Sequence, residues 1–245
     1  MSNLTDTQIK ALTFEQLPVL TTSQIIALRS SHVAVLAPPQ FAVLTIEDIA
    51  AFSTGQLAAL SSGQITAMTS AQLTALTTTG LSSLSTTQII TLTSQQVPVL
   101  KTGQIQAITT SQINALTTIQ IASLTTDQAK ALTGNQTLAL TTQQLQTLNT
   151  DQLAAFDPSD ISVLSSDQIA VLKSEQIAGL TTSQIVALTT TQMVTLSTSQ
   201  LTNLKANQVA ALTNTQIPSL TTAQIAALKT NQIAALTNSQ IPQLT

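Results

Sequence analysis

The chain has 245 residues, of which 43% are hydrophobic, 7% charged and 2% aromatic, and its formal net charge is -3. It has no cysteine and one histidine, which excludes disulfides, thiolate catalysis and Cys- or His-rich metal sites, so we expect no metal and no cofactor. Seven basic residues in an acidic chain argue against nucleic-acid binding. No apolar run approaches the roughly 18 residues of a membrane-spanning helix, so we expect no membrane insertion.

An eight-residue repeat, here called the octad, runs from Leu4 to Leu244 without insertion or deletion. Its consensus is Thr-x-x-Gln-Ile-x-Ala-Leu, as in residues 181–188. Gln occupies 26 of the 30 positions that are multiples of eight, and Leu occupies 27 of the 31 positions of its slot. The four exceptions at the Gln slot are His32, Asp48, Gly80 and Asp160. An unbroken repeat is typical of solenoids, and we predict a single repeat domain over residues 1–245.

Each octad reads as one short helix that begins with a capping box. The Thr side chain accepts from a first-turn N–H, and the Gln side chain reaches back to the N–H of the Thr. Pro38 and Pro158 directly follow the cap position, where proline is favoured. We therefore predict an all-α solenoid of very short capped helical turns, one per octad.

A β-solenoid is the alternative, because Ile, Val and Thr favour strands. The apolar residues lie three and then five apart, however, without the alternation of a half-buried strand. A proline one residue after the apolar slot fits neither fold well, because it removes a helical hydrogen bond. We expect the octads that carry it to hold a single helical turn, and they contain Pro18, Pro98, Pro218 and Pro242.

A longer period is visible in the substitutions at the cap position. When the caps are sorted into three interleaved series with a step of 24 residues, one series contains only Thr and Ser. This pattern predicts three octads per turn and a three-sided rod. The uninterrupted series is also the candidate binding face, and it comprises Thr21, Thr45, Thr69, Thr93, Thr117, Thr141, Ser165, Thr189, Thr213 and Thr237.

The few titratable residues favour capping over catalysis. His32 stands at the Gln slot, and it has no second His or Cys as a partner. Asp48 and Asp160 occupy the same slot, and Asp157 is itself a cap, where a carboxylate suits the positive end of a helix. We predict that the chain has no catalytic residues and is not an enzyme.

With catalysis, metal binding and nucleic-acid binding disfavoured, a structural role is the function that the sequence favours. We predict a structural or interaction rod: a spacer, a stalk or the subunit of a filament that associates end to end. The alternative is a binding module that uses the regular Thr/Ser face, for ice binding or adhesion.

The segments TTSQIVAL, TTAQIAAL and TTDQAKAL resemble the short Thr-Gln-Ile-Ala-Leu repeat arrays of large bacterial surface or secreted proteins. The resemblance covers residues 4–245 and carries no catalytic residues. It implies an extracellular or cell-surface location, although the first ten residues lack the features of a cleaved secretion signal. A cytoplasmic location stays open.

Overall fold

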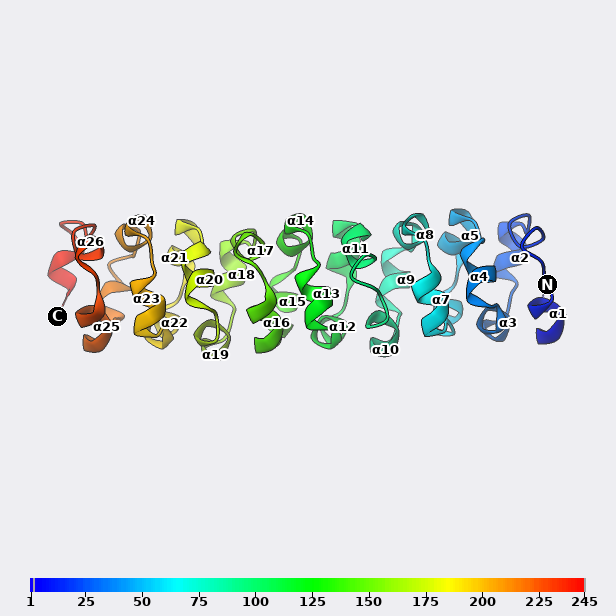
Figure 1. Cartoon of the computed structure of the whole chain (residues 1–245), viewed down its shortest axis with the longest axis horizontal. Coiled ribbons are helices and arrows are strands. Elements are labelled where there is room, and N and C mark those ends of the chain that lie inside the picture. The colour runs from blue at the N-terminus through cyan, green and yellow to red at the C-terminus, as the bar shows by residue number, and fades with distance from the viewer. Residues whose placement is uncertain (2, 245) are drawn as a thin grey trace. The chain divides into compact units, whose positions relative to one another are not determined.

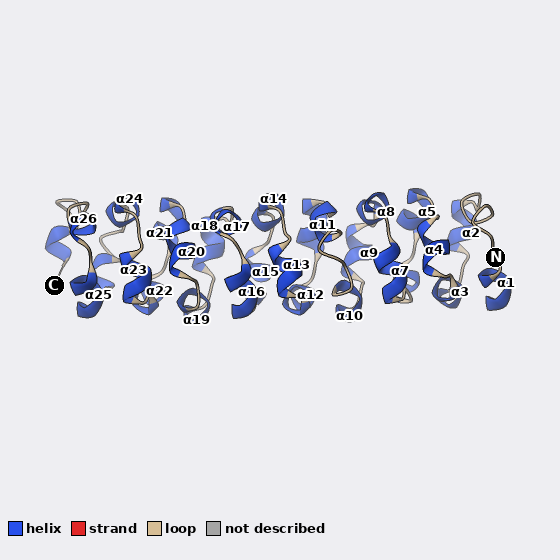
Figure 2. Cartoon of the chain, in the orientation of Figure 1, coloured by secondary structure: helices blue, strands red, loops and turns tan. Residues whose placement is uncertain are grey.

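The computed structural model describes residues 1 and 3–244, and its helices follow the octads one by one. The residues described contain α-helices and 3-10 helices but no strand (Figure 2). The predicted all-α solenoid is therefore confirmed, and the β-solenoid alternative is wrong.

The contacts divide the chain into two parts, Met1–Ser123 and Leu124–Thr245, each described here by itself. The repeat register continues through both, and the predicted single domain stays a prediction. The N-terminal part holds α1 (Asp6–Lys10), α2 (Thr22–Ile26), α3 (Ser30–Val35), α4 (Pro38–Ala42), α5 (Ile46–Ala51), α6 (Thr54–Ala58), α7 (Ser62–Ala67), α8 (Ser70–Ala75), α9 (Thr78–Ser82), α10 (Thr86–Ile89), η1 (Val97–Val99), α11 (Thr102–Ala107), α12 (Thr110–Ala115) and α13 (Thr118–Ala122).

The C-terminal part has the same organisation. It holds α14 (Thr126–Lys130), α15 (Gly134–Ala139), α16 (Thr142–Thr147), α17 (Thr150–Ala154), α18 (Pro158–Ser162), α19 (Ser166–Ala170), α20 (Ser174–Gly179), α21 (Thr182–Ala187), α22 (Thr190–Thr195), α23 (Thr198–Thr202), α24 (Ala206–Ala210), η2 (Ile217–Ser219), α25 (Thr222–Ala227), α26 (Thr230–Ile233) and η3 (Ile241–Gln243).

A capping box starts most of the helices, and the six-residue helices end at an extended residue in the Leu slot. At α21, Thr181 Oγ1 accepts from the Gln184 N–H at 3.2 Å, and Gln184 Oε1 accepts from the Thr181 N–H at 2.8 Å. Leu188 then adopts an extended conformation (φ -58°, ψ 130°), which ends the helix after six residues. The two reciprocal bonds satisfy N–H groups that a helix start otherwise leaves unpaired.

Proline at the slot after the apolar residue shortens the helix, as predicted. The octads of Pro98, Pro218 and Pro242 contain a turn followed by a three-residue 3-10 helix that carries the proline. Residues 13–20, which contain Pro18, form turns only. Proline has no N–H to donate and cannot continue the α-helical hydrogen-bond pattern.

Helices pack against the helix three octads further along the chain. In the N-terminal part α4 contacts α7 and α5 contacts α8, and in the C-terminal part α17 contacts α20 and α18 contacts α21. This spacing confirms that neighbours in successive layers are three octads apart.

The three series of octads nevertheless do not keep fixed sides. Hydrogen bonds between layers join residues 25 to 31 positions apart, for example Ser30 Oγ to the Gly55 carbonyl and Gln56 Nε2 to the Ile25 carbonyl, both at 2.9 Å. One turn therefore takes more than the 24 residues predicted, and each series winds around the axis. In Figure 1, α5, α8 and α11 follow one another along the upper edge of the N-terminal part, although α11 belongs to another series.

The core of each part is made of the two apolar slots of the octad. Ile185 is fully buried and Leu188 is 3% exposed, and the equivalent residues of other octads are similar. The octad of residues 133–140 departs from this pattern, because Thr137 takes the core slot and Leu138 is 49% exposed. The buried Thr137 hydroxyl has no hydrogen-bond partner.

Candidate functional site

The Gln side chain performs two functions at once, and the second joins the layers. Gln184 Oε1 completes the capping box of its own helix, while Nε2 donates to the carbonyls of Leu153 and Phe156, both at 2.8 Å. These acceptors stand 31 and 28 residues earlier, in the second half of the octad 149–156. This octad is four before that of Gln184 and directly precedes the octad of α18, against which α21 packs. We call this set of amide bonds the glutamine ladder.

The ladder recurs through both parts with little change in geometry. In the N-terminal part Gln104 Nε2 bonds the Leu73 and Leu76 carbonyls at 2.8 Å. The residues whose Nε2 bonds are described are Gln40, Gln56, Gln64, Gln72, Gln88, Gln96, Gln104, Gln112, Gln120, Gln152, Gln168, Gln176, Gln184, Gln192, Gln200, Gln208, Gln216, Gln224, Gln232 and Gln240.

The chemistry of the ladder requires an amide. The Leu carbonyl at the end of each octad is one of the acceptors that a helix C-terminus leaves without an intrahelical partner. Glu could complete the capping box equally well, but its carboxylate has no donor for that carbonyl and would bury a charge. The absence of Glu from all 30 Gln-slot positions is the sequence signal for this role.

At His32, two residues share the functions of one Gln. His32 is fully buried, and its Nδ1 accepts from the Arg29 N–H at 3.3 Å. Arg29 Nη2 donates to the Leu4 carbonyl at 2.9 Å, the acceptor that a Gln amide would reach from this slot. The predicted role of His32 as a capping substitute is confirmed, and Arg29 supplies the missing interlayer bond.

The two Asp residues at the Gln slot keep the capping function only. Asp48 Oδ2 accepts from the Thr45 N–H at 3.0 Å. Asp160 is 7% exposed, and burial raises its pKa; the charge of Asp157 adds to the rise, and a hydrogen bond from the Asp157 backbone opposes it. The predicted cap at Asp157 is wrong in one respect, because its side chain makes no capping hydrogen bond, although Pro158 does occupy the first helical position.

The candidate Thr/Ser face is used in capping. In the series defined above, every hydroxyl except that of Thr237 accepts from the N–H three residues later, at 3.1 to 3.3 Å. Thr237 Oγ1 instead pairs with Ser239 Oγ at 3.0 Å. Within each part the series winds around the axis, so its members in that part do not form one flat array. Ice binding or adhesion at these residues stays a prediction.

Within residues 1 and 3–244, no three His, Asp or Glu side chains lie close enough to hold a metal ion. Across the same residues, none of the helices has both the length and the apolar character needed to cross a bilayer.

A comparison with protein-family models gives six matches to one family, described as the ALTTAQ repeat. The matched residues are 41–78, 98–134, 153–190, 166–198, 185–222 and 217–245, which together cover more than half of the chain. The family's six letters span the junction of two octads, as in Ala187–Gln192, which reads ALTTTQ. The chain matches none of the curated proteins with which it was compared.

Proposed function

Because the chain belongs to the ALTTAQ repeat family, we propose that it is a non-enzymatic structural array, a spacer whose layers also associate end to end with a second copy. The observation that supports this is the direction of the glutamine ladder. Every described amide at the Gln slot donates toward the N-terminus of the chain, to a carbonyl of an earlier octad.

A layer built in this way has two different and complementary faces. One presents Gln amide donors, and the other presents Leu-slot carbonyls. Gln8, Gln16 and Gln24 are exposed, whereas the later glutamines of the Gln slot are buried. A second copy stacked head to tail would supply carbonyl acceptors to these three amides, and such a contact repeats without closing.

Replacing these glutamines with Glu tests the association without removing the caps. In the triple variant Q8E/Q16E/Q24E each Glu can still complete a capping box, but no side chain can donate to a neighbouring copy. We expect the unmodified protein to form concentration-dependent end-to-end particles by light scattering and electron microscopy. The triple variant should remain dispersed at the same concentrations.

The matched control is T7E/T22E/S23E, which adds the same three charges at exposed first-turn positions of the same layer. It should assemble like the unmodified protein and melt at a similar temperature. Dispersed unmodified protein at every concentration, or assembly of the triple variant, would contradict end-to-end association.

We also propose a location outside the cell or at its surface, supported by the resemblance to repeat arrays of bacterial surface proteins. Protease treatment of intact cells tests the location. Degradation of the protein while a cytoplasmic marker survives is expected, and full protection would contradict the proposal.

A further inference from the structure

One groove on the N-terminal part lies where four octads meet. It is lined by α5, α8, α9 and α11 and by residues at their ends, and its volume is about 570 Å³. In Figure 1, α5, α8 and α11 follow one another along the upper edge of this part. Sites that bind small molecules have volumes of this order, so the groove has room for a ligand. We call it the α5–α11 groove.

Residues that depart from the octad consensus meet in this groove. Ile46 directly follows a cap, where Ser or Thr is usual, and it is 46% exposed. Lys101 takes the place of a cap Thr, and Gly103 stands two residues later. All three line the groove, although their octads are far apart in the sequence. The groove therefore has a composition of its own rather than that of the repeat.

Glu47 and Lys101 bring opposite charges to the lining of the groove. Both are exposed, and neither forms an ion pair within residues 1 and 3–244. The Lys101 side chain makes no capping hydrogen bond either. The exposed Ile46 and Ala50 and the half-buried Ala75 add apolar surface to the same lining. A ligand that suits this groove therefore has an apolar part and both signs of charge.

The glutamine ladder is interrupted at one residue of the groove. In the octads of α6 and α7, the carbonyls of Ala58 and Thr66 accept from the Gln residue 30 positions later, at 3.2 Å. The residue 30 positions after Ala50 is Gly80, which has no side chain that could donate. The Ala50 carbonyl is therefore an acceptor that the ladder does not use.

We infer that the α5–α11 groove binds an extended peptide segment of a partner protein, in which two apolar residues stand between a basic and an acidic residue. The basic side chain pairs with Glu47 and the acidic side chain with Lys101, and the apolar side chains contact Ile46 and Ala50. A backbone N–H of the peptide supplies a donor for the Ala50 carbonyl. This binding uses none of the exposed glutamines of the end-to-end contact, so either interaction can fail alone.

Peptides that differ only in charge order test the inference. The probes are fluorescently labelled tetrapeptides with both ends blocked: Lys-Leu-Leu-Glu, Glu-Leu-Leu-Lys and the neutral Gln-Leu-Leu-Gln. By fluorescence anisotropy at low salt, we expect one of the two charged peptides to bind most tightly, because only one order matches the two charges of the groove. The double variant E47K/K101E should reverse the preference between the charged peptides, which a loss of folding cannot do.

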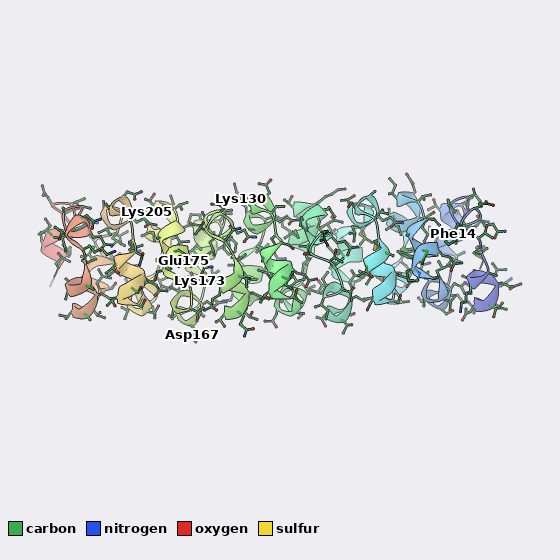
Figure 3. The ribbon with its side chains drawn as sticks, viewed as in Figure 1. Phe14, Lys130, Asp167, Lys173, Glu175 and Lys205 are labelled. Carbon is green, nitrogen blue, oxygen red and sulfur yellow. The ribbon has the colours of Figure 1, made fainter. Side chains whose placement is uncertain are left out.

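The C-terminal part offers matched controls at the same octad slots. Lys173 and Glu175, both labelled in Figure 3, occupy the slots of Lys101 and Glu47 in the octad of α20. K101Q or E47Q should weaken binding of the preferred peptide about two- to fivefold, as expected for one exposed ion pair. K173Q and E175Q should leave its binding unchanged.

Filling the groove is an independent test that changes no charge. A Cβ added at Gly103 would meet no atom within 4 Å, and Ile119 occupies the same slot of another octad. G103I should therefore fold with an unchanged melting temperature, yet its side chain should occupy the groove and abolish binding. Equal binding of the three peptides, no reversal by E47K/K101E, equal effects of the control variants, or full binding by G103I would overturn the inference.

Discussion

At the scale of single residues, the two roles of the Gln side chain explain why the Gln slot of the octad is so regular. Gln184 is fully buried, yet all its polar atoms are paired, with Oε1 on its own cap and Nε2 on the layer below. A buried polar group that is fully paired contributes to stability, whereas an unpaired one costs free energy. The same atoms therefore select Gln over Glu at nearly every octad.

Replacing Gln184 with Glu should separate the two functions of the ladder. Q184E keeps the capping acceptor, loses two interlayer bonds and buries a charge, so we expect a loss of about 3 kcal/mol in the free energy of unfolding. T181A, which removes only the hydroxyl cap of the same helix, should cost about 1 kcal/mol. Urea denaturation measures both. Equal losses would mean that the interlayer bonds contribute nothing.

Asp160 predicts a pH dependence of stability. Its raised pKa means that the folded protein holds the proton more tightly than the unfolded chain. Stability from this group is therefore full below the ordinary aspartate range and declines as pH rises through the interval up to the raised pKa. D160Q removes the titration and restores the amide donor, so it should be more stable than the unmodified protein at neutral pH by about 1 kcal/mol.

The advantage of D160Q should shrink in acid, where the unmodified carboxyl is neutral. Denaturation at neutral and acid pH checks this, with D167N on an exposed first-turn position as the control. A constant difference between D160Q and the unmodified protein across pH would contradict the assignment.

At the scale of the helix, the sequence predicts nearly all of the local structure. Thr181 and Gln184 form the expected capping box, and Pro158 begins a helix as expected. The hydrogen bonds from the Gln side chains to other layers could not be predicted in this way, because capping rules treat Glu and Gln alike. Likewise, nothing in the octad pattern shows that Arg29 and His32 act together, since the Leu4 carbonyl they serve is 25 residues from Arg29.

At the scale of the whole chain, the octad fixes the packing partner but not the rotation between layers. Clustering of exceptions at 24 residues predicts that helices three octads apart are neighbours, and α18 and α21 are such a pair. The angle between successive octads depends on backbone geometry at residues such as Leu188, where small changes in ψ accumulate along the array. The spacing of residues in the sequence therefore does not predict that the Thr/Ser series winds around the axis.

Because every series winds around the axis, no series of octads is confined to one side of the solenoid, and one complete octad should be the smallest removable unit. Deleting residues 181–188 brings equivalent octads into contact and leaves the ladder with the same spacing. We expect unchanged helical circular dichroism per residue and a melting temperature within about 3 °C of the unmodified protein. Deleting residues 181–184 removes half an octad, puts Gln amides and Leu carbonyls out of register, and should abolish cooperative melting. If only the 24-residue deletion of residues 181–204 were tolerated, the sides would be fixed, and the winding inferred from the interlayer bonds would be wrong.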